Sequence, residues 1–219
     1  MSPLSRPRVG VLSLQGDFAC HRASLEALGV EAQRVTLPRD LEGLDALVMP
    51  GGESTTMLRL LAATGLRAPI ESFVRSRPVL GTCAGVILLG QAGEGLPAPT
   101  FGMLDVEVER NAYGRQLASF SERLEAPPLG DGFLGVFIRA PRLVRVGRGV
   151  EVVARRARGG AGPGEPVGVR QGSVVGLCFH PELTPDTRFH EWFLTRVAGL
   201  PAAGGRPPGG ASARGGPRR

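Results

Sequence analysis

Residues 8–90 alternate between short apolar runs and segments with helical spacing, and this alternation constrains the fold more than any other feature. The apolar runs are RVGVLSL (8–14), EAQRVTL (31–37), LDALVMPGG (44–52) and VLGTC (79–83). The helical segments between and after them are DFACHRASLEALG, ESTTMLRLLAATG, APIESFVRSR and AGVILLGQAG. Strands that alternate with helices predict a parallel sheet covered on both faces.

The pattern changes at residue 104. From there the chain contains short β runs divided by Gly and Pro, with no helical spacing between them: LDVEVER, GFLGVFIR, LVRVG, VEVVARR, PVGVRQG and SVVGLCF. These runs predict antiparallel additions to the same sheet, or a small sheet beside it. A last helix, PDTRFHEWFLTRVAG, closes the domain. We therefore expect an α/β fold of three layers, with a mostly parallel central sheet, flanking helices and antiparallel additions in the C-terminal half.

The 219 residues suffice for one domain, which we place at residues 1–199. Residues 200–219 consist mainly of Gly, Pro, Ala and Arg and should be disordered, because they offer almost nothing to bury. Four arginines of this tail account for most of the net charge of +6, so the body gives no reason to expect a nucleic-acid partner.

The location of the chain is indicated by what its sequence lacks. No apolar stretch approaches the ~18 residues that a membrane span needs, and the N-terminus does not resemble a signal peptide. The three cysteines, at positions 20, 83 and 178, are too few and too widely spaced for a disulfide framework. We expect a cytoplasmic protein without a membrane partner.

The segment GTCAG (81–85) places Cys83 between two glycines, where a strand gives way to a helix. This arrangement is typical of a nucleophile elbow, in which the glycines permit a sharp turn and the close packing of a helix. The start of the helix favours the thiolate, and the N–H group of Ala84 can bind an oxyanion. The alternative is that Cys83 is a small buried core residue.

A nucleophilic cysteine needs a base and a group that orients the base. His21 and His190 lie on helices beside arginines, so we expect both to be solvated. His180 ends a strand in the sequence HPE, and Glu182 returns to the same side in an extended chain. Cys83, His180 and Glu182 are therefore a candidate catalytic triad, although histidines also cap strands without a chemical role.

The segment PGGES (50–54) follows a buried strand, and its two glycines allow an N–H group to approach a reacting carbonyl. We expect Gly52 and Ala84 to form an oxyanion hole. The segment lacks the lysine and the glycine spacing of a phosphate-binding loop. Cys20, His21 and Cys178 show no metal-ligand spacing, so no metal and no cofactor are expected.

Taken in order, PGGEST, GTCAG and HPE resemble the class I, triad-type glutamine amidotransferases. More narrowly, LSLQGDF, GTCAGVILL, FGMLDVEVERNAYGRQLASF, VFIRAP and FHPEL resemble the glutaminase subunits of pyridoxal 5'-phosphate synthase, over about Val9–Leu194. This resemblance implies hydrolysis of L-glutamine and transfer of ammonia to a separate barrel-shaped synthase subunit. The glutamine-binding positions that it implies are Gly52, Glu53, Ser54, Arg110, Ile138 and Arg139.

Charge supports this substrate, because an arginine such as Arg110 or Arg139 suits the α-carboxylate of glutamine. Without the resemblance, each would be a solvated charge at a strand end. Two other functions remain open, a γ-glutamyl peptidase that needs no partner and an inert binding module. We further expect a switch in the Gly51-Gly52 peptide, with Gln15 at the same sheet edge as the residue that senses the partner.

Overall fold

The computed structural model describes residues 6–92, 95–110, 112, 119–130, 132–157 and 163–202. Most of the expected tail and most of the RNAYGRQ segment lie outside these residues. Leu200 and Ala202 pack against the core, so the packed part of the chain extends at least to Ala202. None of the helices in the described ranges combines the length and the apolar character that a membrane span requires.

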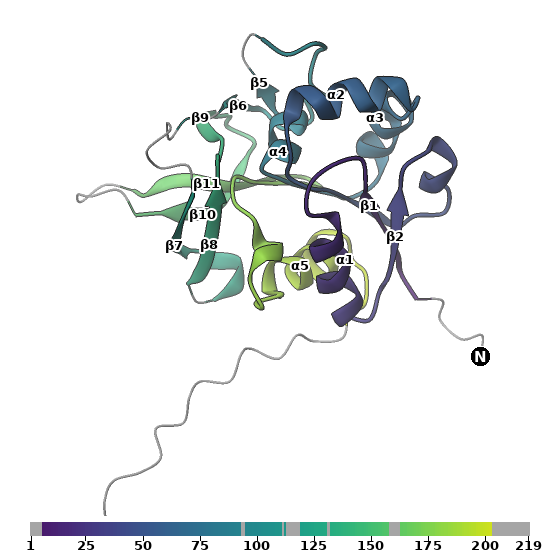
Figure 1. The fold of residues 1–219 in the computed structure, drawn as a ribbon. Coiled ribbons are helices and arrows are strands. Elements are labelled where there is room, and N and C mark those ends of the chain that lie inside the picture. The colour runs from purple at the N-terminus through teal and green to yellow at the C-terminus, as the bar shows by residue number, and fades with distance from the viewer. Residues whose placement is uncertain are drawn as a thin grey trace, which may run out of the picture.

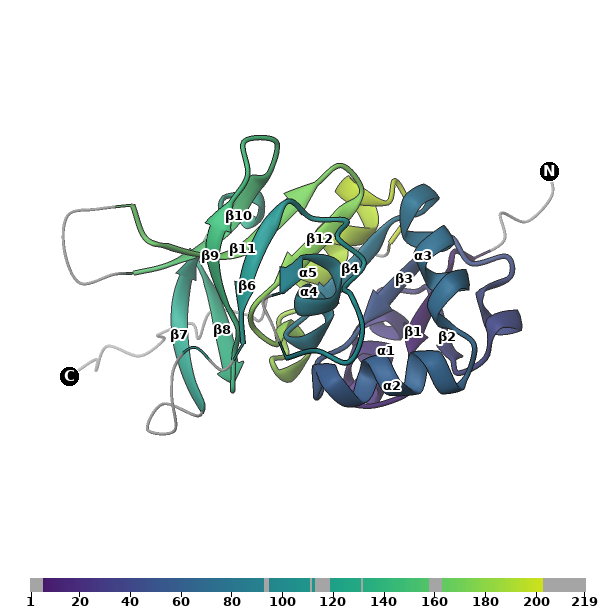
Figure 2. The ribbon, with the colours of Figure 1, turned by 90° about the horizontal axis from the view of Figure 1, so that it is seen from above.

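A nine-stranded sheet runs through the molecule in the order β2-β1-β3-β4-β12-β11-β10-β7-β8. The first five strands of this order are parallel, and the last four are antiparallel additions. Figure 2 shows the parallel strands at one end of the molecule and the additions at the other. The strands are β1 (Arg8–Leu12), β2 (Glu31–Val35), β3 (Ala46–Met49), β4 (Val79–Thr82), β7 (Ser119–Glu125), β8 (Phe133–Ile138), β10 (Glu151–Arg156), β11 (Glu165–Gln171) and β12 (Val174–Leu177).

A second sheet of three strands has the order β5-β6-β9. Its strands are β5 (Gln91–Ala92), β6 (Val106–Glu109) and β9 (Arg142–Val146). The additions to the main sheet and the small separate sheet are thus both present. One detail was wrong: β12 pairs in parallel with β4, because this fully buried strand extends the parallel core and is not an antiparallel addition.

Helices cover both faces of the main sheet, as expected (Figure 1). α1 and α5 lie on one face, and α2, α3 and α4 lie on the other. The helices are α1 (Phe18–Ala27), α2 (Ser54–Ala63), α3 (Arg67–Ser76), α4 (Ala84–Leu89) and α5 (Arg188–Trp192), and α5 continues as a π-helical turn over Phe193–Val197. The three-layer α/β architecture is confirmed.

Aromatic packing fixes the face on which α5 lies. Phe133 of β8, Phe179 after β12 and Phe189 of α5 are fully buried, and their ring centroids lie 4.8–5.9 Å apart. Edge-to-face and tilted pairs at such distances stabilise a core beyond the area that they bury. This cluster holds the segment after β12, which carries His180, between the sheet and α5.

Candidate active site

Four neighbouring parallel strands, β1, β3, β4 and β12, end at the same edge of the sheet. Ligands bind at this edge in open α/β sheets, since the loops there converge. The loops enclose a cavity of about 400 Å³, a volume suited to a small molecule. Its lining residues are Gln15, Gly16, Asp17, Gly51, Gly52, Glu53, Ser54, Cys83, Ile87, Arg110, Ile138, Arg139 and His180.

Cys83 lies between β4 and α4 with a φ of 49°, a conformation that is strained for a residue with a Cβ atom. Its backbone N–H donates to the Leu177 carbonyl at 2.8 Å, which ties the turn to the end of β12. Gly85 is needed for close packing, because a Cβ there would collide with the Met49 carbonyl oxygen of β3. The local geometry is that of a nucleophile elbow, with the thiol exposed to the cavity.

His180 and Glu182 are joined by a hydrogen bond of 2.7 Å between Nδ1 and Oε1. Both side chains are buried. The expected reason for their proximity was wrong: Pro181–Leu183 form a 3₁₀ turn, and this turn, not an extended chain, carries Glu182 back to the ring. The backbone N–H of His180 donates to the Val136 carbonyl of β8 at 2.8 Å, and this bond fixes where the turn begins.

The charges of this pair depend on their neighbours. Burial disfavours the imidazolium, but hydrogen bonds and charge from Cys83 and Glu182 outweigh it and raise the pKa of His180 to about 10. Burial also disfavours the Glu182 carboxylate, but His21 and His180 outweigh it and hold the pKa of Glu182 well below its usual range. The site therefore favours an imidazolium beside an ionised carboxylate at neutral pH.

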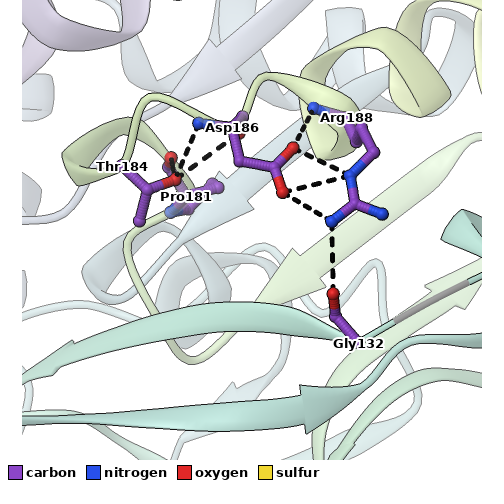
Figure 3. A network of polar contacts seen from close by, with 5 residues as sticks. All are labelled: Gly132, Pro181, Thr184, Asp186 and Arg188. Carbon is purple, nitrogen blue, oxygen red and sulfur yellow. Dashed lines mark hydrogen bonds and ion pairs between the residues drawn. The ribbon is translucent and has the colours of Figure 1, made fainter. Parts of the chain in front are cut away.

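The segment after the HPE turn is anchored by a second polar network (Figure 3). Both carboxylate oxygens of Asp186 accept from the Arg188 guanidinium, at 2.6–3.0 Å, and Arg188 Nη2 also donates to the Gly132 carbonyl at 3.1 Å. Thr184 Oγ1 donates to the Pro181 carbonyl at 3.2 Å. These contacts tie the segment after the turn to Gly132, just before β8.

Gly51 lies close to both Cys83 and His180. A Cβ at this position would collide with the Cε1 atom of His180 and would lie 3.2 Å from the Cβ of Cys83. The next residue, Gly52, has a φ of 146°, which few other residues adopt. Gln15 Oε1 accepts from the Glu53 N–H at 3.2 Å, so the Gln15 side chain contacts the loop that contains Gly52.

The other expected binding residues surround the same cavity. Glu53 caps α2, and its carboxylate accepts from the N–H groups of Thr55 and Thr56 at 3.0 and 2.7 Å. Burial disfavours the carboxylate, but the hydrogen bond from the Thr56 hydroxyl and those from the two N–H groups outweigh it and lower the pKa of Glu53 to about 2. Arg110 reaches the same helix end, with Nη1 3.4 Å from Thr55 Oγ1. Ser54 is buried at the start of α2.

Ile138 and Arg139, at the end of β8, also line the cavity. The Cys83 Sγ lies 3.8 Å from the Ile138 carbonyl oxygen, as a thiol donor to it. Arg139 has a φ of 44°, so it is the second non-glycine residue in the left-handed region among those described. Sequence reasoning missed the strain at Arg139, and it also missed Asp17 and Ile87 as cavity residues.

The expectation that His21 and His190 are solvated was wrong. Both side chains are fully buried, and His21 Nδ1 lies 2.9 Å from His190 Nε2. His21 Nε2 lies 3.2 Å from Oε2 of Glu182, so this pair stands directly behind the candidate triad. The spacing of His21, Leu25 and Leu28 along one helical face was the available signal, since residues four and seven apart share a face.

The other two cysteines differ from Cys83 in their surroundings. Cys178 is fully buried, and burial raises the pKa of its thiol. Burial and the charge of Asp17 raise the pKa of Cys20 as well. Neither thiol is among the cavity residues, whereas Cys83 is.

One group in the described part of the chain has potential metal ligands close together. Asp17, His180 and Glu182 each bring one such atom within 4.8 Å of the others. His180 and Glu182 are already bonded to each other, and Asp17 is exposed.

With this geometry established, comparison with known proteins identifies the family. Residues 11–199 match the family model described as the SNO glutamine amidotransferase family. The chain belongs to this family. A crystal structure described as a glutamine amidotransferase superposes with a TM-score of 0.79 at 47% identity, covering 88% of this chain and 99% of that one.

Two curated members of the family illustrate the similarity. The pyridoxal 5'-phosphate synthase subunit PdxT of Thermus thermophilus is 51% identical over 195 residues, which are 88% of this chain and 98% of the relative. The protein of the same name from Geobacillus kaustophilus is 48% identical over 191 residues, or 87% and 94% of the two chains. The family match thus spans nearly all of the described fold.

Proposed function

We propose that this chain is the glutaminase subunit of a pyridoxal 5'-phosphate synthase, and that it hydrolyses L-glutamine to L-glutamate and ammonia. The observation that carries the mechanism is the placement of Cys83, His180 and Glu182 at one edge of the sheet, with Cys83 and His180 lining a cavity of about 400 Å³. The names of the curated relatives support the assignment to this synthase.

The first half of the reaction releases ammonia. Cys83 Sγ, as the thiolate, attacks the side-chain amide carbon of glutamine, and the carbonyl oxygen becomes an oxyanion. The N–H groups of Gly52 and Ala84 are our candidates for stabilising it. Because Nδ1 of His180 is bonded to Glu182, Nε2 is the atom that transfers a proton. It protonates the amide nitrogen, the C–N bond breaks, and a γ-glutamyl thioester and ammonia result.

The second half of the reaction releases glutamate. His180 is neutral after the first step, so it can take a proton from water while the oxygen of that water attacks the thioester. The C–S bond breaks, glutamate leaves, and the thiolate faces an imidazolium again. Glu182 remains ionised throughout and holds the ring so that Nε2 faces the reacting atoms.

Charged groups around the cavity suit the two ends of glutamine. Arg110 and Arg139 both line the cavity and are available for the α-carboxylate. The Glu53 carboxylate, fixed by its bonds to Thr55 and Thr56, is available for the α-ammonium. Together with Gly52, Ser54 and Ile138 they make up the proposed binding residues, and the reaction needs no cofactor and no metal.

The partner in this proposal is the barrel-shaped synthase subunit, which receives the ammonia in the cytoplasm. Ammonia that escapes into water is protonated and lost, so a glutaminase that acts alone wastes its substrate. A physical switch is available in the loop of Gly51 and Gly52, whose peptide can change orientation at little cost. Gln15 contacts this loop, which makes it our candidate for sensing the partner.

The isolated chain is therefore expected to be a poor glutaminase that its synthase partner activates by about 10²–10³-fold, the cost of one misaligned oxyanion donor. The measurement is glutamate release with and without the synthase subunit, for the wild type and for Gln15→Ala. We expect Gln15→Ala to reduce the activation.

Each result of this experiment has a distinct meaning. Full activity of the isolated wild type would refute the switch, and equal activation of Gln15→Ala would remove Gln15 from it. Hydrolysis of γ-glutamyl peptides without any partner would favour a peptidase, whereas no glutamine turnover under any condition would favour a binding module.

A further inference from the structure

Two buried histidines that the proposed mechanism does not use stand behind Glu182. His21 belongs to α1 and His190 to α5, and the two helices lie on the same face of the sheet (Figure 1). Both side chains are fully buried. Buried imidazoles are costly unless they are bonded, so a pair placed beside a catalytic carboxylate calls for a physical reason.

The two carboxylate oxygens of Glu182 differ in their hydrogen bonds. Oε1 accepts from His180, but Oε2 is buried and forms no hydrogen bond within the described residues. His21 Nε2 lies 3.2 Å from this oxygen and also 3.2 Å from Thr82 Oγ1, to which it is hydrogen-bonded. An uncompensated buried oxygen of an ionised carboxylate is unfavourable, so the positive end of the His21 N–H is what compensates it.

His190 determines which nitrogen of His21 carries that proton. Burial lowers the pKa of His190 to about 3, so this ring is neutral and has a single N–H. Its Nδ1 has no hydrogen-bond partner within the described residues, whereas its Nε2 lies 2.9 Å from His21 Nδ1. If His21 Nδ1 donated to His190 Nε2 instead, the single proton of His190 would lie on Nδ1 as a buried donor without an acceptor, so the proton of His190 belongs on Nε2. His21 Nδ1 then accepts, and the His21 proton lies on Nε2, toward Glu182.

We propose that His21 is a positioning residue, which holds the Glu182 carboxylate ionised and oriented toward His180, with His190 fixing the tautomer of His21. The proposal rests on the proposed function of the triad and extends it to the two buried histidines behind Glu182. The other titratable groups around Glu182 are Asp17 and Cys20 on the α1 side and His180 in its own turn, with Cys83 beyond His180. Of these groups only His180 is an imidazole, and its Nδ1 is already bonded to Oε1 of Glu182.

Two polar substitutions distinguish the contributions of the two ring nitrogens of His21. The amide of glutamine reaches the place of Nε2 and can donate to Glu182, whereas the shorter amide of asparagine reaches only the place of Nδ1. We expect His21→Asn to lower kcat about 10- to 100-fold at unchanged KM, the range found when a group that orients a metal ligand from behind is removed. We expect His21→Gln to retain most of the activity.

The pH profile distinguishes this role from a merely structural one. Without the His21 N–H, the pKa of Glu182 rises, so the carboxylate is lost at a higher pH on acidification. The acidic limb of kcat against pH should therefore move to higher pH in His21→Asn and return toward its wild-type position in His21→Gln. Ser24→Ala, which removes another buried polar group of α1, should leave the limb in place.

The experiment measures glutamate release against pH in the complex with the synthase subunit, and Cys83 alkylation by iodoacetamide against pH in the isolated chain. The second readout needs no glutamine turnover, so failure of the proposed function and failure of the proposal remain distinguishable. If His21→Asn folds but its acidic limb lies at the wild-type pH in either readout, the proposal is overturned. If His21→Asn does not fold, a loss of kcat in His21→Gln as large as in Glu182→Gln would do the same.

Discussion

Replacing Cys83 with alanine should lower kcat for glutamine hydrolysis by about 10⁶-fold, the loss seen when a serine protease loses its catalytic nucleophile. No other thiol is among the residues that line the cavity, so none can replace it. The fold should survive, since alanine has the same Cβ as cysteine and meets the same strain at a φ of 49°. The measurement combines glutamate release in the complex with a thermal melt.

Cys20→Ala is the matched control for this variant. Cys20 is half-buried, and its side chain is not part of the cavity lining. Its removal should leave both kcat and the melting temperature close to those of the wild type. If Cys83→Ala retained a measurable fraction of wild-type activity, or if Cys20→Ala abolished it, the assignment of the nucleophile would be wrong.

Replacing Glu182 with glutamine should lower kcat by about 10⁴-fold, the effect of the equivalent change in a serine protease triad. Glutamine keeps the shape of the side chain but loses the charge that stabilises the imidazolium. It can also present its NH₂ group to His180 Nδ1, which then has to accept and leaves the proton on the wrong nitrogen. KM should change little, because Glu182 is buried behind His180, outside the cavity lining.

Glu165→Gln is a suitable control for this change. Glu165 is similarly buried, but its carboxylate lies 3.6 Å from Arg156 in the antiparallel part of the sheet. Removing that charge should affect stability without lowering kcat. Equal losses of kcat in the two variants would mean that Glu182 acts only through the stability of the fold.

The layered fold could be predicted because its signals are local. Short apolar runs between helical segments predicted β1, β3 and β4, and each is a buried parallel strand. The pairing of β12 was not predictable in this way, because its partner β4 lies far away in the sequence. β7 was missed since its residues are mostly polar, with Leu124 as its only fully buried side chain.

The positions of the candidate triad residues could also be inferred from the sequence, although one reason for them could not. The glycines around Cys83 indicated the elbow, and the structure has the expected turn there. Glu182 was placed beside His180 by an extended-chain argument, whereas a 3₁₀ turn brings it there. The chain around that turn makes distant contacts, such as the bonds from His180 to Val136 and from Arg188 to Gly132, which no local pattern reveals.

The buried histidines show the main limit of reading the sequence alone. His21 and His190 each adjoin an arginine, which suggested exposed helices. Each also lies on the apolar face of its helix, and burial follows that face and not the neighbouring charge. Whether two such rings meet depends on how two helices pack on one sheet face, and this information is not local.

Covalent trapping of the nucleophile tests the central claim most directly. The complex with the synthase subunit is treated with a glutamine-mimicking alkylator, with and without excess L-glutamine, and the modified peptide is identified by mass spectrometry. We predict modification at Cys83 alone, because the thiols of Cys20 and Cys178 have raised pKa values and lie outside the cavity lining. L-glutamine should suppress it. Modification confined to Cys20 or Cys178, or labelling of Cys83 that L-glutamine does not suppress, would contradict the account.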